Sequence, residues 1–230
     1  GFAGSAPTAT PWLASAFVEG RWAWADRWTL IGGFRDQLTS TVGRRIEPRV
    51  SVRYSPSSRV ALLAGYARTR QSTQSLRNDE SLVDALIGIA LPVAAAPGGL
   101  PAARADQLTA ALVVEGGAGT VVSLDAYTRR LDGLVLTAPF TGQPFATDGV
   151  ARGTGRARGV GLSVTRSGPR VSGHASYAWA TTTRESAGRQ YRPWYDVTNT
   201  LTAALAYRPT SALALRTALT AAGGRPTSVT

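Results

Sequence analysis

The sequence predicts an all-β fold, an antiparallel up-and-down transmembrane β-barrel segment with about ten strands of a larger barrel. Three observations predict it. Apolar and polar residues alternate along ten stretches, most of them about as long as a tilted bilayer-spanning strand. Short and long connections alternate between these stretches. Within the stretches, most charged residues lie on the face opposite to the apolar residues.

The first five stretches carry their apolar residues at even positions. Val50, Val52 and Tyr54 alternate with polar residues in the third stretch, for example, and Leu108 begins the same pattern in the fifth. An alternation of period two is typical of a strand with two different faces. The strands predicted here are Trp12–Trp24, Trp28–Phe34, Pro48–Tyr54, Arg59–Thr69 and Leu108–Glu115.

The second five stretches show the same alternation of apolar and polar residues. Val160, Leu162 and Val164 alternate with Gly, Ser and Thr, whereas the stretch that begins at Thr120 fits less cleanly. In the last three stretches the apolar residues lie at odd positions. The strands predicted here are Thr120–Arg130, Gly159–Arg166, Val171–Thr181, Val197–Tyr207 and Leu213–Leu219.

The odd-numbered connections are short and rich in Gly, Pro, Ser and Asp, the residues that tight turns need. The even-numbered connections are longer, and all of them lie at the opposite end of the predicted sheet. Short periplasmic turns and long extracellular loops are typical of an outer-membrane barrel. The predicted long connections are Thr39–Glu47, Gln71–Ala105, Leu131–Gly155 and Thr183–Tyr195.

The two faces predict where lipid lies. An arginine in mid-strand on a lipid face would cost roughly 2–4 kcal/mol, so the apolar face is expected to meet lipid and the polar face a lumen. Asp36, Arg68, Arg130 and Arg166 depart from this rule and are interpreted as strand ends. Aromatic residues also favour strands in general, but their positions here predict a girdle beside the short turns, formed by Trp22, Trp24, Trp28, Tyr54 and Tyr207.

Composition excludes several classes of protein. The 230 residues include no Cys, so there is no disulfide framework or cysteine nucleophile, and the 43% hydrophobic content is too high for a disordered chain. The net charge of +11 comes from 25 arginines without any lysine. These arginines are spread over loops, turns and the polar face, so no nucleic-acid partner is expected; anionic headgroups of lipopolysaccharide or an anionic solute would use them equally well.

Several motifs, in order along the chain, resemble the barrel of TonB-dependent outer-membrane receptors. Pro48–Tyr54 is similar to a strand of that family that precedes a strand like Ala64–Arg68 and a long outer loop. The resemblance covers about residues 48–230, although Asn199 stands where the family has His. The further motifs are Ser123–Leu134, Gly155–Gly161 with Val171–Thr183, and Asp196–Leu205 with Gly223–Pro226.

The resemblance implies a receptor in the outer membrane of a Gram-negative bacterium that takes up a scarce, unknown solute. It also implies contact with outer-membrane lipid, and with the TonB complex through a plug domain that residues 1–230 do not contain. Both ends of the chain are expected on the outer side, so residues 1–230 are interpreted as a partial barrel domain without plug and C-terminal strands. The alternatives are a passive porin or other small outer-membrane barrel, and a surface-exposed β-rich adhesin.

No catalytic constellation is visible, so we expect no enzyme activity, cofactor or metal. His174 is interpreted as a polar residue that lines the lumen, and Gly153–Gly159 as a loop that returns to a strand. Asn78 or Asp79 is expected to cap a short helix that runs through Ile87. The candidate solute-binding residues are Arg77, Asp79 and Glu80 in the longest loop, and Arg35, Arg49, Arg53 and Arg129 on the lumenal face.

Overall fold

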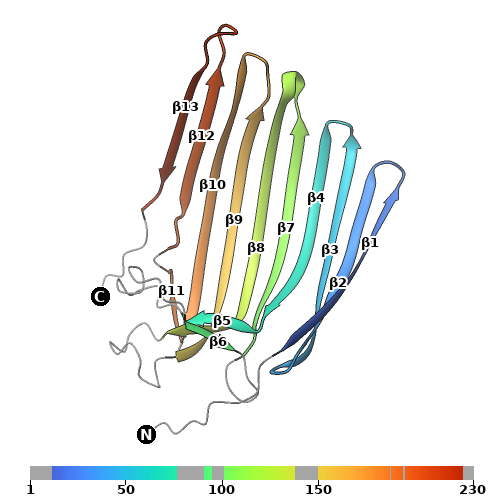
Figure 1. Cartoon of the computed structure of the whole chain (residues 1–230), viewed down its shortest axis with the longest axis vertical. Coiled ribbons are helices and arrows are strands. Elements are labelled where there is room, and N and C mark those ends of the chain that lie inside the picture. Colours follow the sequence, from blue (N-terminus) through green and yellow to red (C-terminus); the bar gives the residue numbers. More distant parts are fainter. Residues whose placement is uncertain are drawn as a thin grey trace.

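The computed structural model describes residues 12–76, 91–94, 101–137, 150–186, 188–193 and 195–224. Ten strands form one antiparallel meander, in which each strand pairs with the next strand of the path (Figure 1). The prediction of an all-β, up-and-down fold is therefore confirmed. The path runs through β1 (Leu13–Trp24), β2 (Trp28–Thr39), β3 (Gly43–Ser57), β4 (Val60–Gln71), β7 (Ala103–Glu115), β8 (Thr120–Thr137), β9 (Val150–Arg166), β10 (Val171–Ser186), β12 (Asn199–Tyr207) and β13 (Leu215–Ala222).

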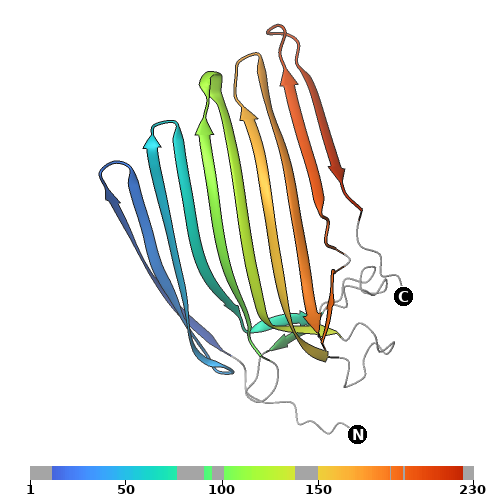
Figure 2. The ribbon, with the colours of Figure 1, turned by 180° about the vertical axis from the view of Figure 1, so that it is seen from behind.

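The five short connections all lie at one end of the sheet, the short-turn end, which is at the top in Figure 1 and again in the reverse view of Figure 2. Two of them place non-glycine residues in the left-handed region, at Ala25, Asp26 and Ala118, as tight strand connections require. A single 3₁₀ turn, η1 (Gly117–Gly119), joins β7 to β8. In the part of the chain described here, no helix is long and apolar enough to cross a membrane.

At the opposite, long-loop end, the strands run further than predicted. The predicted long connection Thr39–Glu47 is wrong, because β2 ends at Thr39 and β3 begins at Gly43, whose φ of 71° closes a tight turn. The segment Gly153–Gly159 is part of β9 and not a loop. Likewise β8 continues to Thr137 and β10 to Ser186, where β11 (Arg189–Tyr191) pairs with it.

The strand register keeps like residues side by side. Tyr54, Leu62, Leu112, Leu124, Leu162, Tyr177 and Leu201 pair directly from β3 to β12 and form what we name the leucine row. Since successive side chains alternate between faces, this register assembles the apolar positions of all ten strands on one face, the apolar face. The opposite face is the polar face.

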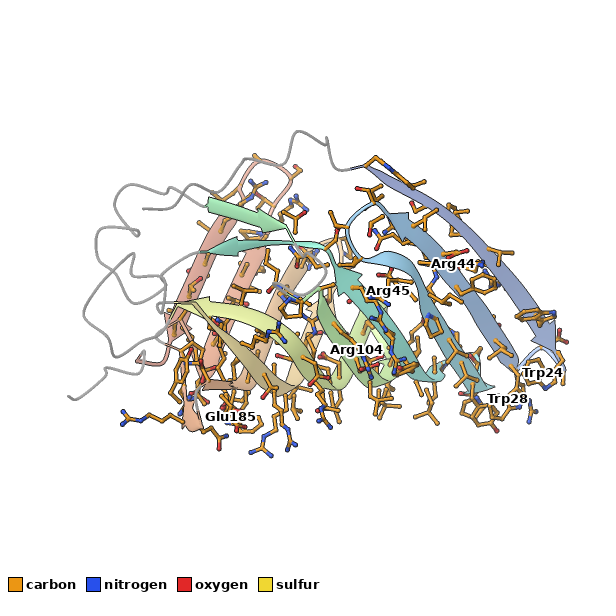
Figure 3. The ribbon with its side chains drawn as sticks, turned by 90° about the horizontal axis from the view of Figure 1, so that it is seen from below. Trp24, Trp28, Arg44, Arg45, Arg104 and Glu185 are labelled. Carbon is orange, nitrogen blue, oxygen red and sulfur yellow. The ribbon has the colours of Figure 1, made fainter. Side chains whose placement is uncertain are left out.

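The sheet has almost no core between packed layers. Among the described residues, only four apolar side chains are buried, and none of the large ones is fully buried. The chain exposes 15511 Å², against about 10,000 Å² for a soluble monomer of its mass. In Figure 3 the sheet is curved, and Trp28 lies on its convex side. The apolar face therefore needs a cover from outside the chain.

A two-stranded sheet, β5 (Thr73–Leu76) with β6 (Leu91–Ala94), lies at the long-loop end and reaches across the concave side (Figures 1 and 3). The buried side chain of Gln74 holds it there. Its amide nitrogen donates to the carbonyls of Pro101 and Gly133, at 3.1 and 2.9 Å, and its amide oxygen accepts from the N–H of Val135 at 3.0 Å. Gln74 thus attaches the longest connection to a bulge in β8.

Candidate functional site

The polar face carries a row of hydrogen-bonded charges near the middle of the sheet. Glu19 on β1 pairs with Gly33 on β2, which pairs with Arg49 on β3. Because Gly33 has no side chain, the Glu19 carboxylate crosses β2 and lies 2.9 Å from the Arg49 guanidinium. The same row continues to Gln107 and Arg129, which are paired on β7 and β8. A shallow hollow of about 380 Å³ lies between Glu19, Arg49 and Gln107.

The structure brings the four predicted lumenal arginines to this polar face, all of them exposed. Arg35 donates to the Ser15 hydroxyl at 3.1 Å, and Arg53 to the Ser55 hydroxyl at 3.3 Å. The Nε of Arg129 donates to the amide oxygen of Gln107 at 2.8 Å. Arg49 and Arg129 lie in the same row. Arg35 lies closer than this row to the long-loop end of the sheet, and Arg53 lies closer to the short-turn end.

Glycines on the polar face make room for polar side chains of the neighbouring strand. A Cβ on Gly161 would lie 2.7 Å from the Asp125 carboxylate, and one on Gly159 would lie 2.7 Å from the Tyr127 ring. This explains why the glycine-rich segment of β9 is a strand. Its glycines permit close approach across the ladder, and they do not serve loop flexibility.

Hydroxyl groups fill the polar face closer to the short-turn end. Pairs of side chains on neighbouring strands are hydrogen-bonded, Ser123 with Ser163 at 2.7 Å and Ser176 with Thr202 at 2.6 Å. The Nδ1 atom of His174 lies 3.0 Å from the Thr165 hydroxyl, so the histidine is a polar member of this face. Within the described residues, no group of three or more His, Cys, Asp or Glu side chains could hold a metal ion.

The apolar face ends in aromatic rings at the short-turn end. Trp28 stacks between Trp24 and Tyr54, with ring-centroid separations of 5.9 and 4.3 Å. Trp22 lies over Gly20, where a Cβ would come within 2.5 Å of the indole. Tyr207 of β12 is exposed at the same end. Rigid amphipathic rings in such a line suit the boundary between a hydrocarbon layer and water.

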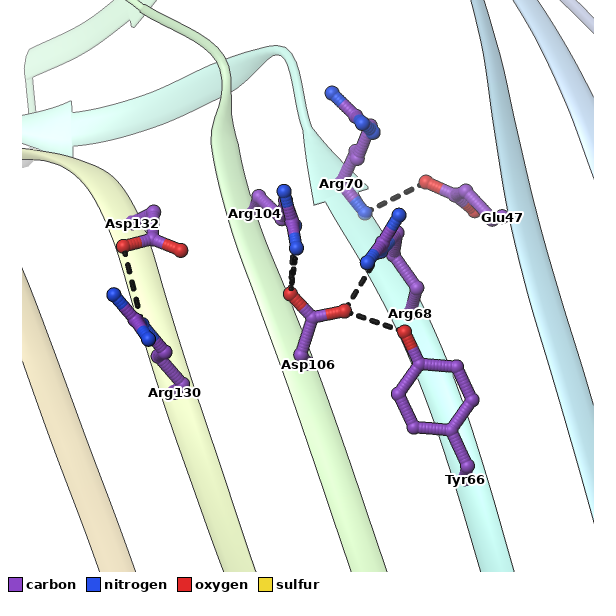
Figure 4. Close-up of polar contacts among 8 residues, drawn as sticks. All are labelled: Glu47, Tyr66, Arg68, Arg70, Arg104, Asp106, Arg130 and Asp132. Atoms are coloured by element: carbon purple, nitrogen blue, oxygen red, sulfur yellow. Dashed lines mark hydrogen bonds and ion pairs between the residues drawn. The ribbon is translucent and has the colours of Figure 1, made fainter.

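At the long-loop end the apolar face becomes charged. Asp106 accepts hydrogen bonds from the Tyr66 hydroxyl at 2.6 Å, from Arg68 at 2.7 Å and from Arg104 at 2.6 Å (Figure 4). From the sequence alone, Arg68 is interpreted only as a strand end, and Asp106 is missed. Their even positions, in phase with the apolar residues of β4 and β7, are the signal that could have found them.

The remaining predicted site residues, Arg77, Asp79 and Glu80, lie outside the described residues, as does the helix expected to run through Ile87.

Comparisons with known proteins agree with this architecture. The family model "TonB dependent receptor-like, beta-barrel" matches residues 3–228. No curated protein sequence matches the chain. Among solved structures, the alcaligin outer-membrane receptor FauA of Bordetella pertussis is similar over 93% of this chain and 38% of its own, with 17% identity and a TM-score of 0.62.

Two further structures are similar at this level. The siderophore receptor PirA of Acinetobacter baumannii has 12% identity and a TM-score of 0.64, over 90% of this chain and 33% of its own. The FrpB iron transporter of Neisseria meningitidis has 17% identity and a TM-score of 0.59, over 86% of this chain and 31% of its own. These likenesses concern the fold, and the chain spans about a third of the length of these receptors. The family model covers nearly the whole chain, so the chain belongs to the TonB-dependent receptors and forms part of the β-barrel of such an outer-membrane receptor.

Proposed function

We propose that these ten strands are part of the wall of a larger barrel in the outer membrane of a Gram-negative bacterium. The apolar face meets lipid, the polar face lines the lumen, and the short-turn end faces the periplasm. The receptor takes up a scarce solute with energy from the TonB complex, transmitted through a plug domain. The exposed apolar face that continues across ten strands is the observation that carries the proposal, since lipid can cover it and water cannot.

The slope of the aromatic line supports insertion. Tyr54 on β3 lies in the leucine row with Leu201 on β12, six strand-to-strand steps or about 29 Å away. Tyr207, the girdle residue of β12, lies six residues beyond Leu201 toward the short-turn end, or about 20 Å along the strand. If both rings mark one membrane plane, the strands are tilted by about 35°, a value within the range of transmembrane barrels.

The solute class is proposed from two considerations. The names of the relatives FauA, PirA and FrpB include alcaligin, siderophore and iron, so ferric siderophores are the first class to test. The four exposed arginines of the polar face suit an anionic chelate, because guanidinium groups bind oxyanions in a bidentate way. The residues proposed to face the solute path or the plug are Arg35, Arg49, Arg53 and Arg129, with Arg77, Asp79 and Glu80 in the longest loop.

Spin labels at neighbouring positions test the membrane placement. Because residues 1–230 lack cysteine, Leu124→Cys and Asp125→Cys give matched sites on opposite faces of β8. In the full-length receptor in bilayers, the label at position 124 should be relaxed by dissolved oxygen, which concentrates in hydrocarbon. The label at position 125 should be relaxed by a water-soluble nickel complex. Equal access of the nickel complex to both labels would refute the placement.

Uptake assays test the transport proposal. Cells that produce the full-length receptor are offered a panel of iron-55-labelled ferric siderophores, with a TonB-deficient strain as control. TonB-dependent accumulation from one siderophore supports the proposal. Accumulation that survives the loss of TonB would instead indicate a passive porin, and no accumulation from any member of the panel would refute the proposed solute class.

A further inference from the structure

Six arginines occupy apolar-face positions just beyond the apolar residues at the long-loop end. We name them the arginine belt: Arg68, Arg70, Arg104, Arg130, Arg156 and Arg158. They belong to four neighbouring strands, β4, β7, β8 and β9. Direct pairing places them in adjacent rows. One row contains Arg68, Asp106, Arg130 and Arg156, and the next contains Arg70, Arg104 and Asp132.

Like charges face each other directly in this belt. Arg130 pairs with Arg156, and Arg70 pairs with Arg104. Directly opposed like charges destabilise an antiparallel ladder, so both pairs cost stability in the absence of an anion. Arg158 lies two residues from Arg156 on the same face of β9, so the Cα atoms of Arg130, Arg156 and Arg158 lie within about 8 Å of one another.

The acidic groups nearby offset only part of this positive charge. Asp106 is already bound by Arg68, Arg104 and the Tyr66 hydroxyl. Asp132 lies 3.7 Å from Arg130, whose side chain is still 65% exposed. Within the described residues, Arg156 and Arg158 have no carboxylate within ion-pair distance, and Arg158 instead lies 5.9 Å above the Trp179 ring.

The belt follows the edge of the apolar band. On β2 the outward-facing charge nearest the short-turn end is Asp36. On β9, apart from Arg166 beside the short turn itself, it is Arg158, which lies two rows nearer to the short-turn end than Asp36. The charged edge of the apolar face therefore shifts toward the short-turn end from β2 to β9, in the same direction as the aromatic line. The arginine belt thus stays at about one height in the proposed membrane. Tyr66 and Trp179 lie immediately beside it. The belt is therefore placed where the hydrocarbon layer ends and headgroups begin.

We infer that the arginine belt binds the phosphate groups of an anionic lipid of the outer leaflet, with the acyl chains lying along the leucine row. The inference rests on the proposed membrane orientation. A phosphate placed between Arg130, Arg156 and Arg158 would replace their mutual repulsion with charge-assisted hydrogen bonds. The belt residues are in phase with the apolar residues of their strands and not with the lumenal face, so the ligand is a lipid rather than a transported solute.

The test uses the full-length receptor, delipidated in detergent, and bisphosphorylated lipid A as the probe. The triple variant Arg130→Gln, Arg156→Gln, Arg158→Gln is compared with the matched control Arg166→Gln, Arg170→Gln, Arg208→Gln, which removes three exposed charges at the short-turn end. Native mass spectrometry measures the bound lipid. The belt variant should bind lipid A at least about tenfold more weakly, and the control should bind it like the wild type.

Three results would overturn the inference. They are equal binding of lipid A by the two triple variants, equal binding of lipid A and its dephosphorylated form by the wild type, and displacement of lipid A by millimolar inorganic phosphate, which would indicate a site for free anions. Heat-modifiable migration on gels confirms that each variant folds as a barrel. A normal spin-label pattern at positions 124 and 125 together with phosphate-independent lipid binding would refute the belt alone, whereas an abnormal pattern would refute the proposed orientation itself.

Discussion

Replacement of Leu124 by arginine tests the lipid-facing assignment most directly. Leu124 lies in the leucine row, flanked by Leu112 and Leu162, and 45% of it is exposed in the isolated sheet. The arginine belt begins six residues away at Arg130, about 20 Å along β8, which is further than an arginine side chain reaches. The introduced guanidinium would therefore remain in hydrocarbon.

The expected cost of Leu124→Arg is about 2–4 kcal/mol of the free energy of unfolding. A cost of this size lowers the folding equilibrium constant by a factor between about 30 and several hundred. The neighbouring substitution Ser123→Arg adds the same charge on the polar face and loses one hydrogen bond, to Ser163, so it should cost about 1 kcal/mol.

Guanidinium titration of the full-length receptor in lipid vesicles, followed by tryptophan fluorescence, measures both values. The wild type and the two variants are compared under the same lipid composition. Equal losses of stability for the two variants, or a larger loss for Ser123→Arg, would refute the assignment of the two faces.

Substitutions of Gln74, Gly161 and Trp28 test contacts elsewhere in the sheet. Gln74→Leu removes three hydrogen bonds at the β8 bulge, so hydrogen exchange at the Val135 amide should accelerate strongly, while amides in the half of β8 nearer to the short-turn end keep their protection. Gly161→Ala places a methyl group 2.7 Å from the Asp125 carboxylate and should lower the melting temperature, and the additional change Asp125→Gly should restore most of the loss; no rescue would contradict the contact. Trp28→Ala breaks two ring stacks and should cost about 1–3 kcal/mol in vesicles, clearly more than Trp12→Ala, for which the described residues show no ring contact.

The ten strands and their two faces could be predicted from the sequence because apolar and polar side chains alternate along most of each strand. Val160, Leu162 and Val164 in β9 show this directly. The pattern fails toward the long-loop end. Arg156 and Arg158 continue the outward positions of β9, but there the pattern is inverted, because Ala157 between them is less polar than either.

Backbone pairing nevertheless continues beyond the apolar residues, because the ladder hydrogen bonds do not depend on what the side chains contact. This is why Gly153–Gly159 was predicted as a loop and is a strand, and why the turn after Thr39 was predicted to be longer than it is. The row that contains Glu19, Arg49 and Arg129 could not be predicted at all. It depends on the register of six strands, and no single stretch of sequence encodes that register.

Each strand position is thus defined by two properties, the face that it occupies and its height relative to the bilayer. Position 124 and Arg130 share a strand and a face, and they differ only in height. Arginine is expected to be costly at the first, where hydrocarbon surrounds it, and favourable at the second, where phosphate can reach it. Polarity alone made Arg130 an exception to the rule of alternation. The height of Arg130 relative to the proposed bilayer accounts for its charge, because an outward-facing residue should match whichever layer of the membrane lies beside it.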